Sequence, residues 1–409
     1  MMSSENNQSS FSKYIALGDS LTAGYADGAL SLEGQHFCYP NLIASQLGHP
    51  AIFRQPLVKD IAGIGFNGTE PRSRLVPLWK HDCKGMVCLQ PSPGPVPDPD
   101  NLNYIGHLGP YHNLGIPGAR SFHLLIPGYG SETGNPYFRR FATSTEASVL
   151  QDATAIGADF FSLWIGNNDV LAYGIAAGKS DPVTPVDKFE AYLHKILKKL
   201  TGKGARGIIA TIPDVTQIPF FNTIPTGSFL PEKPEVIDLL NNQYKTAGLK
   251  FKPGYNPFVL QEAGKIRFIE EDEKILLDIP FDMVKCEGLG SFAPIPDRFV
   301  LKTEDLKLLA STTLAYNEII RSMAARFDLA LADINLNIRS WPAGIGFDQI
   351  RNCISYLPDG IFSLDGIHLS PKGCAVVANI FIEALNEKFR FNAPLTDPEN
   401  FRGTVEKKV

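Results

Sequence analysis

Short apolar runs that end at turn-forming residues recur along the chain. Four of them are followed at once by glycine, proline or aspartate: 14–17, 160–165, 207–212 and, more weakly, 329–332. Runs of this length and composition are typical of strands that are buried on both faces, as in a parallel sheet. The pattern therefore predicts at least four parallel strands, each of which ends in a loop.

Helical periodicity follows between these strands. Apolar residues recur at helix spacing over 189–200, 306–327 and 376–389. Thr184-Pro185 offers a cap and a first-turn proline to the first helix, and Ser370-Pro371 does the same for the third. Strands that alternate with helices predict an α/β fold around a parallel sheet.

Two long stretches interrupt this alternation. Residues 50–112 are rich in glycine and proline, and residues 215–300 hold many prolines and aromatic residues. Long loops of this kind are usually functional or have structure of their own. We therefore expect one domain over 11–390 with both stretches inserted above the active edge of its sheet, and terminal extensions at 1–10 and 391–409. A plain packing role for the second insertion is an equal alternative.

Composition narrows the class of protein. Of 409 residues, 44% are hydrophobic and 20% are charged, which is ordinary for a soluble globular chain. The net charge of −5 gives no general attraction to nucleic acid. No run reaches the roughly 18 apolar residues of a transmembrane segment. The polar start of the chain, MMSSENNQSSFSKY, lacks the apolar core of an export signal.

Neither a metal nor a cofactor is expected. The zinc-type ligands His81, Cys83, Cys88, His107 and His112 match no common structural zinc spacing. The glycine pattern at 63–68 is that of a dinucleotide-binding loop, but no helical pattern follows it. Cys83 and Cys88 could close a short loop as a disulfide, which their spacing does not decide.

The first candidate for chemistry is Ser20, in the segment Leu-Gly-Asp-Ser-Leu that follows the first strand. Ligands of open α/β sheets bind at this edge. A serine hydroxyl needs a base, and Asp365 stands three residues before His368, where it could fix the imidazole tautomer. Asp19, Asp169 and Asp214 near the same edge are explained by turn and cap roles.

Acyl transfer also needs donors for an oxyanion. Asn168, in Gly-Asn-Asn-Asp after the second clear strand, offers a side-chain amide. Gly118, in Asn-Leu-Gly-Ile-Pro-Gly, offers an unobstructed backbone N–H, and the N–H of Ser20 would be a third donor.

These four blocks, in this order, resemble those of the SGNH hydrolases, also called GDSL lipases and esterases. The name-giving residues of that family correspond to Ser20, Gly118, Asn168 and His368, with Asp365 as the acidic partner. Gly118 is preferred to Gly115 because the family's glycine stands five residues after the asparagine of its block. The resemblance implies a flavodoxin-like three-layer α/β/α sandwich.

The resemblance also implies hydrolysis of a carboxylic ester through an acyl-enzyme, without a cofactor. A lipid or acyl-chain ester is favoured by the apolar insertion around Phe220, Phe221 and Phe229. A carbohydrate O-acetyl ester is the close alternative, and a non-catalytic binding protein on the same fold is the alternative from another class. The opening segment is similar to large bacterial, lipoprotein-like members, which implies the periplasm or cell envelope.

Overall fold

The computed structural model describes residues 12–48, 52–67, 70–180, 182–231, 233–337, 341–349 and 351–407. Five parallel strands form its central sheet, in the spatial order β8 (Asn113–Gly115), β1 (Tyr14–Gly18), β9 (Phe160–Trp164), β10 (Arg206–Ala210) and β16 (Ala330–Ala332). In chain order this is 2-1-3-4-5, the order of flavodoxin-like folds. The predicted α/β fold and all four predicted strands are confirmed, and β8 is an additional strand.

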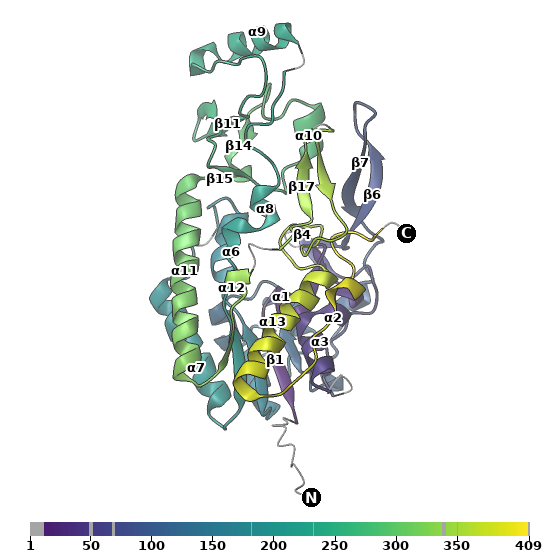
Figure 1. Ribbon diagram of the computed structural model, residues 1–409, viewed down its shortest axis with the longest axis vertical. Coiled ribbons are helices and arrows are strands. Elements are labelled where there is room, and N and C mark those ends of the chain that lie inside the picture. The colour runs from purple at the N-terminus through teal and green to yellow at the C-terminus, as the bar shows by residue number, and fades with distance from the viewer. Residues whose placement is uncertain are drawn as a thin grey trace, which may run out of the picture.

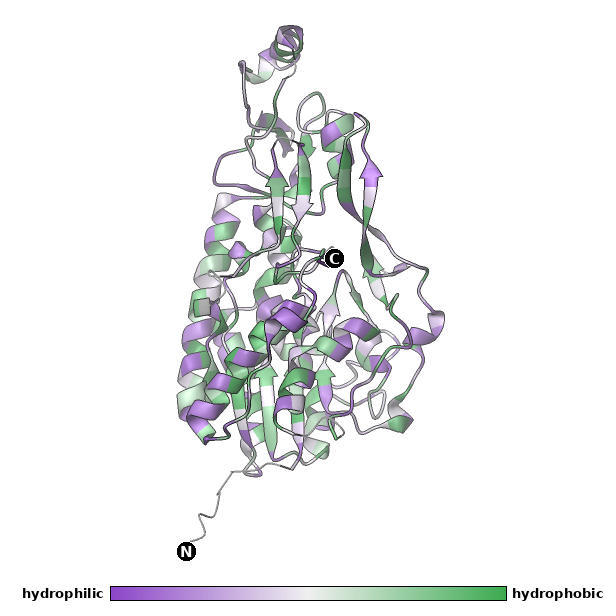
Figure 2. Cartoon of the chain, turned by 45° about the vertical axis from the view of Figure 1, so that its right-hand side comes forward, coloured by the Kyte–Doolittle hydropathy of each residue, from purple (hydrophilic) through white to green (hydrophobic). Residues whose placement is uncertain are grey.

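Helices cover both faces of the sheet. α13 (Pro371–Phe389) and α3 (Tyr39–Gln46) pack together on one face, while α7 (Val186–Thr201), α11 (Thr303–Arg326) and α5 (Val149–Ala155) form the other layer (Figure 1). Consecutive residues of β9 serve the two layers. Phe160 meets Phe389 of α13 with ring centroids 6.3 Å apart, whereas Phe161 lies beside Leu200 of α7. Figure 2 shows the same separation, with apolar strands inside and polar helix faces outside.

Local sequence explains where these helices begin. Ser370 caps α13 by accepting a hydrogen bond from the backbone N–H of Gly373, and Pro371 occupies the first position. α7 begins one residue later than expected, because Pro185 rather than Thr184 is its N-cap. Its apolar stripe is buried as predicted, and burial of each such large side chain stabilises the fold by about 1.5–3 kcal/mol.

In Figure 1 the β6–β7 hairpin of the first inserted stretch and most of the second stretch lie above the ends of the sheet strands, whereas the ends of the first stretch lie beside β1. The first holds two hairpins, β4 (Gly65–Asn67) with β5 (Glu70–Arg72) and β6 (Leu75–His81) with β7 (Val87–Pro93). The second holds α8 (Pro219–Asn222), α9 (Pro234–Gln243), β11 (Val259–Glu262), β12 (Lys265–Phe268), β13 (Lys274–Ile275), α10 (Phe281–Cys286), β14 (Ile295–Pro296) and β15 (Val300–Leu301). Small apolar clusters of its own stabilise it, one of them around Phe258, Leu260 and Ile295.

The remaining helices and strands are short. They are α1 (Ser20–Ala23), β2 (Tyr25–Ala26), β3 (Ala29–Leu30), α2 (Leu32–Phe37), α4 (Pro136–Arg139), α6 (Asn167–Ile175), α12 (Ile334–Asn337) and the hairpin β17 (Ile345–Asp348) with β18 (Cys353–Tyr356). β18 lies beside β7, so the last hairpin joins the first insertion.

The possible Cys83–Cys88 bridge is wrong. Cys83 forms a disulfide with Cys286, 203 residues away, at the end of α10. Cys83 lies in the exposed turn between β6 and β7, whereas Cys88 is buried on β7, with its sulfur 4.0 Å from Nζ of Lys285. The disulfide therefore joins the two insertions. Cys38, Cys88, Cys353 and Cys374 are free thiols.

Three other expectations concern the glycine pattern, membrane spans and metal sites. Residues 1–10 lie outside the described residues, as does Gly68 of the glycine pattern, whose Gly65 belongs to the β4–β5 hairpin. Among the described residues, no helix combines the length and apolar character needed to cross a bilayer. No group of three His, Cys, Asp or Glu side chains there is arranged to hold a metal ion.

Candidate active site

Ser20, His368 and Asp365 lie in one hydrogen-bonded row at the carboxyl edge of the sheet. Ser20 is the first residue of α1, directly after β1 and Asp19. Its Oγ lies 2.9 Å from Nε2 of His368, and Nδ1 of His368 lies 2.8 Å from Oδ2 of Asp365. The structure thus brings together three side chains that are up to 348 residues apart in the chain.

Asp365 is held as a carboxylate. Its oxygens accept hydrogen bonds from the backbone N–H groups of Gly28, Ile367 and His368, each at 2.9 Å, and from the hydroxyl of Ser363 at 3.0 Å. Burial alone would raise the pKa of Asp365, but the charge of His368 and these donors lower it well below the usual range. An ionised Asp365 accepts a hydrogen bond from the Nδ1–H group of His368, which leaves Nε2 unprotonated and able to accept a hydrogen bond from the Ser20 hydroxyl.

Residues that the sequence analysis did not single out also position the imidazole. The ring of Tyr25 lies against that of His368, with centroids 4.7 Å apart, and its hydroxyl donates to the carbonyl of Gly28 at 2.5 Å. Gly28 in turn donates to Asp365. Tyr25 and Gly28 follow Ser20 closely in the sequence, and this proximity was the one available signal.

The predicted oxyanion donors lie on neighbouring segments. The Asn168 amide nitrogen donates to the carbonyl of Ala119 at 3.0 Å, next to Gly118. A primary amide carries two N–H groups, so one is left for a ligand. The segment is fixed beside the end of β1, because the N–H of Ile116 donates to the carbonyl of Gly18 at 3.0 Å.

Two glycines of this segment have different roles. At Gly115, a Cβ would lie 2.2 Å from the backbone nitrogen of Ala23, so close packing against α1 requires glycine. At Gly118, φ is +81° and a Cβ would meet no atom within 4 Å. Because Gly118 has no Cβ and open space beside it, a ligand can approach its backbone closely.

Asp19 connects the serine segment to the asparagine segment. It is fully buried, caps α1 by accepting from the N–H of Leu21 at 3.0 Å, and accepts from Nδ2 of Asn167 at 2.9 Å. Burial raises the pKa of Asp19 to about 6, although the Asn167 hydrogen bond and the nearby His368 oppose that rise. The sequence predicted its capping role and not its link to Asn167.

The other two acidic residues also have structural partners. Asp169 accepts from the backbone and hydroxyl of Ser121 at 2.7 and 2.6 Å, which holds α6 to the segment after Gly118. Asp214 caps the short turn at Val215–Gln217.

A cavity of about 460 Å³ adjoins the row of side chains at Asp365 and Ile367. Its walls come from both insertions, from β18 and from the segment that carries Asp365. Leu75, Leu89, Phe220, Leu277, Ile279 and Phe281 give it apolar surface, and Arg72, Asp278, Asp282 and Lys285 add charged side chains. We call it the inner cavity. Of the three phenylalanines named from the sequence, Phe220 lines it, whereas Phe221 is fully buried in the core.

A hydroxyl, an imidazole and a carboxylate in this row, at the carboxyl edge of a parallel sheet, have the geometry of a serine hydrolase site. Sequence comparison then gives the family. The profile of the GDSL-like Lipase/Acylhydrolase family matches residues 14–381, so this chain belongs to that family and is a carboxylic ester hydrolase.

Solved structures with a similar fold have low identity to this chain. An acetyl xylan esterase, AlAXEase, is 15% identical, with a TM-score of 0.36, over 91% of this chain and 100% of the other. A lipase/acylhydrolase from Enterococcus faecalis is 11% identical, with a TM-score of 0.37, over 94% and 99%. An extracellular lipase from Streptomyces rimosus is 12% identical, with a TM-score of 0.36, over 92% and 99%. No curated protein sequence matches the chain.

Proposed function

We propose that Ser20 is the nucleophile of this esterase, with His368 as its base and Asp365 as the carboxylate that orients the imidazole. The observation that carries this proposal is the unbroken row from Ser20 Oγ to His368 to Asp365, at 2.9 and 2.8 Å. A base must reach the proton that it abstracts, and these distances allow that transfer without rearrangement.

The reaction takes two steps. As Ser20 Oγ attacks the ester carbonyl, its proton passes to Nε2 of His368, and the imidazolium is stabilised by Asp365. His368 then returns the proton to the leaving alcohol, which leaves an acyl group on Ser20. A water molecule gives its proton to the same Nε2 and attacks the acyl-enzyme. As the bond from Ser20 Oγ to the acyl carbon breaks, His368 returns this proton to Oγ, which releases the acid and restores Ser20.

The oxyanion of each step would be held by three donors. They are the backbone N–H groups of Ser20 and Gly118 and the free N–H of the Asn168 amide. The bond from Asn168 to Ala119 supports this assignment, because it fixes the amide beside Gly118 before the substrate arrives. Donors fixed in advance need no reorganisation during the reaction.

The proposed substrate is a lipid or acyl-chain ester. The inner cavity supports it, since a space of about 460 Å³ with apolar surface beside Asp365 is within the size range of sites for small ligands. An acetyl group would leave most of that apolar surface unused. Preference for acetyl esters would therefore count against this substrate and for a carbohydrate O-acetyl ester.

The test is hydrolysis of p-nitrophenyl esters, from acetyl to palmitoyl, by the wild type and by Ser20→Ala. Loss of the nucleophile should lower kcat by about 10⁴- to 10⁶-fold. Thr22→Ser, in the same short helix, is the matched control for a changed hydroxyl residue. Equal rates for wild type and Ser20→Ala would remove Ser20 as the nucleophile. A folded wild type that hydrolyses no ester and resists serine-directed phosphonates would favour the non-catalytic alternative.

We also propose that the protein works in the bacterial periplasm or cell envelope. The exposed Cys83–Cys286 disulfide supports this location, because disulfides persist in oxidising compartments. Fractionation of the native cells tests it: recovery of the protein with both cysteines reduced, in the cytosol, would contradict the proposal.

A further inference from the structure

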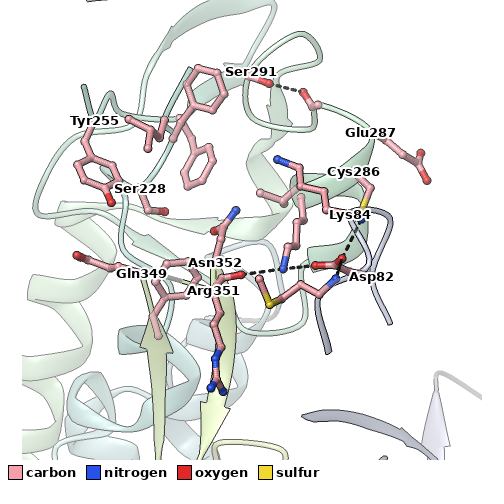
Figure 3. Close-up of a pocket in the computed structure, with 18 of the residues that line it drawn as sticks. Asp82, Lys84, Ser228, Tyr255, Cys286, Glu287, Ser291, Gln349, Arg351 and Asn352 are labelled. Atoms are coloured by element: carbon pink, nitrogen blue, oxygen red, sulfur yellow. Dashed lines mark hydrogen bonds and ion pairs between the residues drawn. The ribbon is translucent and has the colours of Figure 1, made fainter. Parts of the chain in front are cut away.

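A second cavity lies beside the inner cavity, and one residue lines both. The second cavity, which we call the outer cavity, has a volume of about 570 Å³. Its walls come from the β6–β7 turn, from the second insertion and from the turn after β17 (Figure 3). Among the described residues, Lys285 of α10 is the single residue that lines both cavities.

The outer cavity can accept an apolar chain. Aromatic and aliphatic side chains from several segments line it: Phe229, Leu230, Tyr255, Phe258, Phe292 and Phe347. Figure 3 shows Tyr255 and Ser228 on the side of this cavity opposite Asp82 and Cys286. Together with the inner cavity it would form a long space that begins at Asp365 and holds apolar surface along its length.

Lys285 is held firmly between the two spaces. Its side chain is only 4% exposed and forms an ion pair with Asp82, whose side chain is 1% exposed. Its ammonium also donates to the carbonyl of Arg351 at 3.0 Å and lies 4.0 Å from the sulfur of Cys88. The ammonium therefore contacts the β6–β7 hairpin on one side and the β17–β18 hairpin on the other.

The disulfide strengthens the same wall. Asp82 and Cys83 are consecutive in the turn of the hairpin, and Lys285 and Cys286 are consecutive at the end of α10. The ion pair and the disulfide are thus adjacent links between the same two elements. An apolar chain cannot readily displace Lys285, because separating a buried ion pair leaves uncompensated charge.

We propose that Lys285 is a specificity-determining residue that ends the inner cavity and so limits the length of the acyl chain. The outer cavity is then the subsite that the distal part of a longer chain enters when this wall is removed. This inference rests on the proposed function for its substrate class. It adds that wild-type turnover passes through an optimum at medium chain length and falls at palmitoyl.

The test compares two double variants over the p-nitrophenyl ester series. Asp82→Ala with Lys285→Ala removes both charges and the wall, which joins the two cavities. Asp82→Asn with Lys285→Met removes the charges and keeps nearly the same volume. We expect the palmitoyl-to-butyryl ratio of kcat/KM to rise about tenfold or more in the alanine pair, and to stay near the wild-type value in the Asn/Met pair.

Several outcomes would contradict the proposal that Lys285 ends the inner cavity. They are an unchanged ratio in a folded alanine pair, an equal rise in the Asn/Met pair, and a wild type that is as active on palmitoyl as on medium-chain esters. The last measurement needs no variant, so it decides even if the alanine pair does not fold.

A binding measurement separates this inference from the proposed mechanism. Calorimetric titration with palmitate and with butyrate, in the Ser20→Ala background, reports chain fit without turnover. A gain in palmitate affinity that is confined to the alanine pair supports the wall, even if Ser20 is not the nucleophile. Equal palmitate affinity in the folded alanine pair and its parent overturns the wall, whatever the role of Ser20.

Discussion

The catalytic edge of the sheet and the insertions above it are stabilised by different physical means. At the edge, short turns between buried strands and helices fix each side chain, and Asp365 alone accepts three backbone N–H groups. The insertions consist of hairpins and small apolar clusters. The Cys83–Cys286 disulfide and the Lys285–Asp82 ion pair connect the β6–β7 turn to α10.

This difference suggests how the two regions divide their tasks. The edge is tied directly to the large core, so its geometry should tolerate changes in the insertions. The insertions carry the walls of both cavities, so changes there should alter which ester fits. Chemistry and selectivity should therefore respond to different mutations.

The largest effect is expected for Asp365→Asn. The amide cannot replace the carboxylate that fixes the His368 tautomer, so kcat should fall by about 10⁴-fold for every chain length. Asp328→Asn, an exposed carboxylate remote from the site, is the matched control. Steady-state kinetics across the ester series check it. A decrease in kcat that depended strongly on chain length would contradict the division of chemistry and selectivity between the edge and the insertions.

Asn168→Ala should lower kcat by about 10²- to 10³-fold, with little change in KM, because its amide is proposed to act on the oxyanion. Asn168→Asp keeps the shape, adds repulsion toward the oxyanion, and should be at least as impaired. Single-turnover acylation rates measure both. An effect on KM alone would assign Asn168 to substrate binding.

Removal of the disulfide should affect the insertions most. The variant with Cys83→Ser and Cys286→Ser should lose about 2–4 kcal/mol of stability, since the bond closes a loop of 203 residues. Denaturant unfolding and limited proteolysis measure this. We expect acetyl ester hydrolysis to persist while chain-length selectivity weakens. If acetyl ester hydrolysis and chain-length selectivity were lost to the same extent, the catalytic edge would depend on the insertions.

The smallest effect concerns Asp19 and pH. Burial raises its pKa from 3.8 to about 6, so between these values the native state holds a proton that the unfolded state has lost. The free energy of unfolding therefore falls as the pH rises through this window, by up to about 3 kcal/mol.

Asp19→Asn keeps the cap of α1 and lacks this pH dependence. Relative to the wild type, it should be more stable at pH 7.5 than at pH 4, as urea unfolding can measure. A difference in the free energy of unfolding between the two proteins that did not change with pH would contradict the raised pKa of Asp19.

Much of the fold followed from local patterns. Strands such as β9 and helices such as α13 were predicted because burial on two faces, or on one stripe, leaves a regular trace in the sequence. β8 was missed because its three residues, Asn113–Gly115, are too short for such a trace and include an asparagine. Tertiary pairing with β1 makes it a strand.

The candidate site was predictable where its residues lie in recognisable turns, as Ser20, Asn168 and the Asp365–His368 segment do. Its supporting residues were less accessible. The contact of Tyr25 with His368 and the bond from Gly28 to Asp365 join segments more than 300 residues apart, and no spacing rule encodes them.

The sequence by itself therefore determined the α/β class, the family resemblance and the residues proposed for the chemistry, because turns and periodicities are local. Only the tertiary structure decided that Cys83 pairs with Cys286 rather than Cys88, and that Lys285 lines two cavities. The reason is physical: a disulfide or a wall depends on which distant surfaces meet. That meeting is set by the packing of whole insertions and not by the residues on either side of the bond.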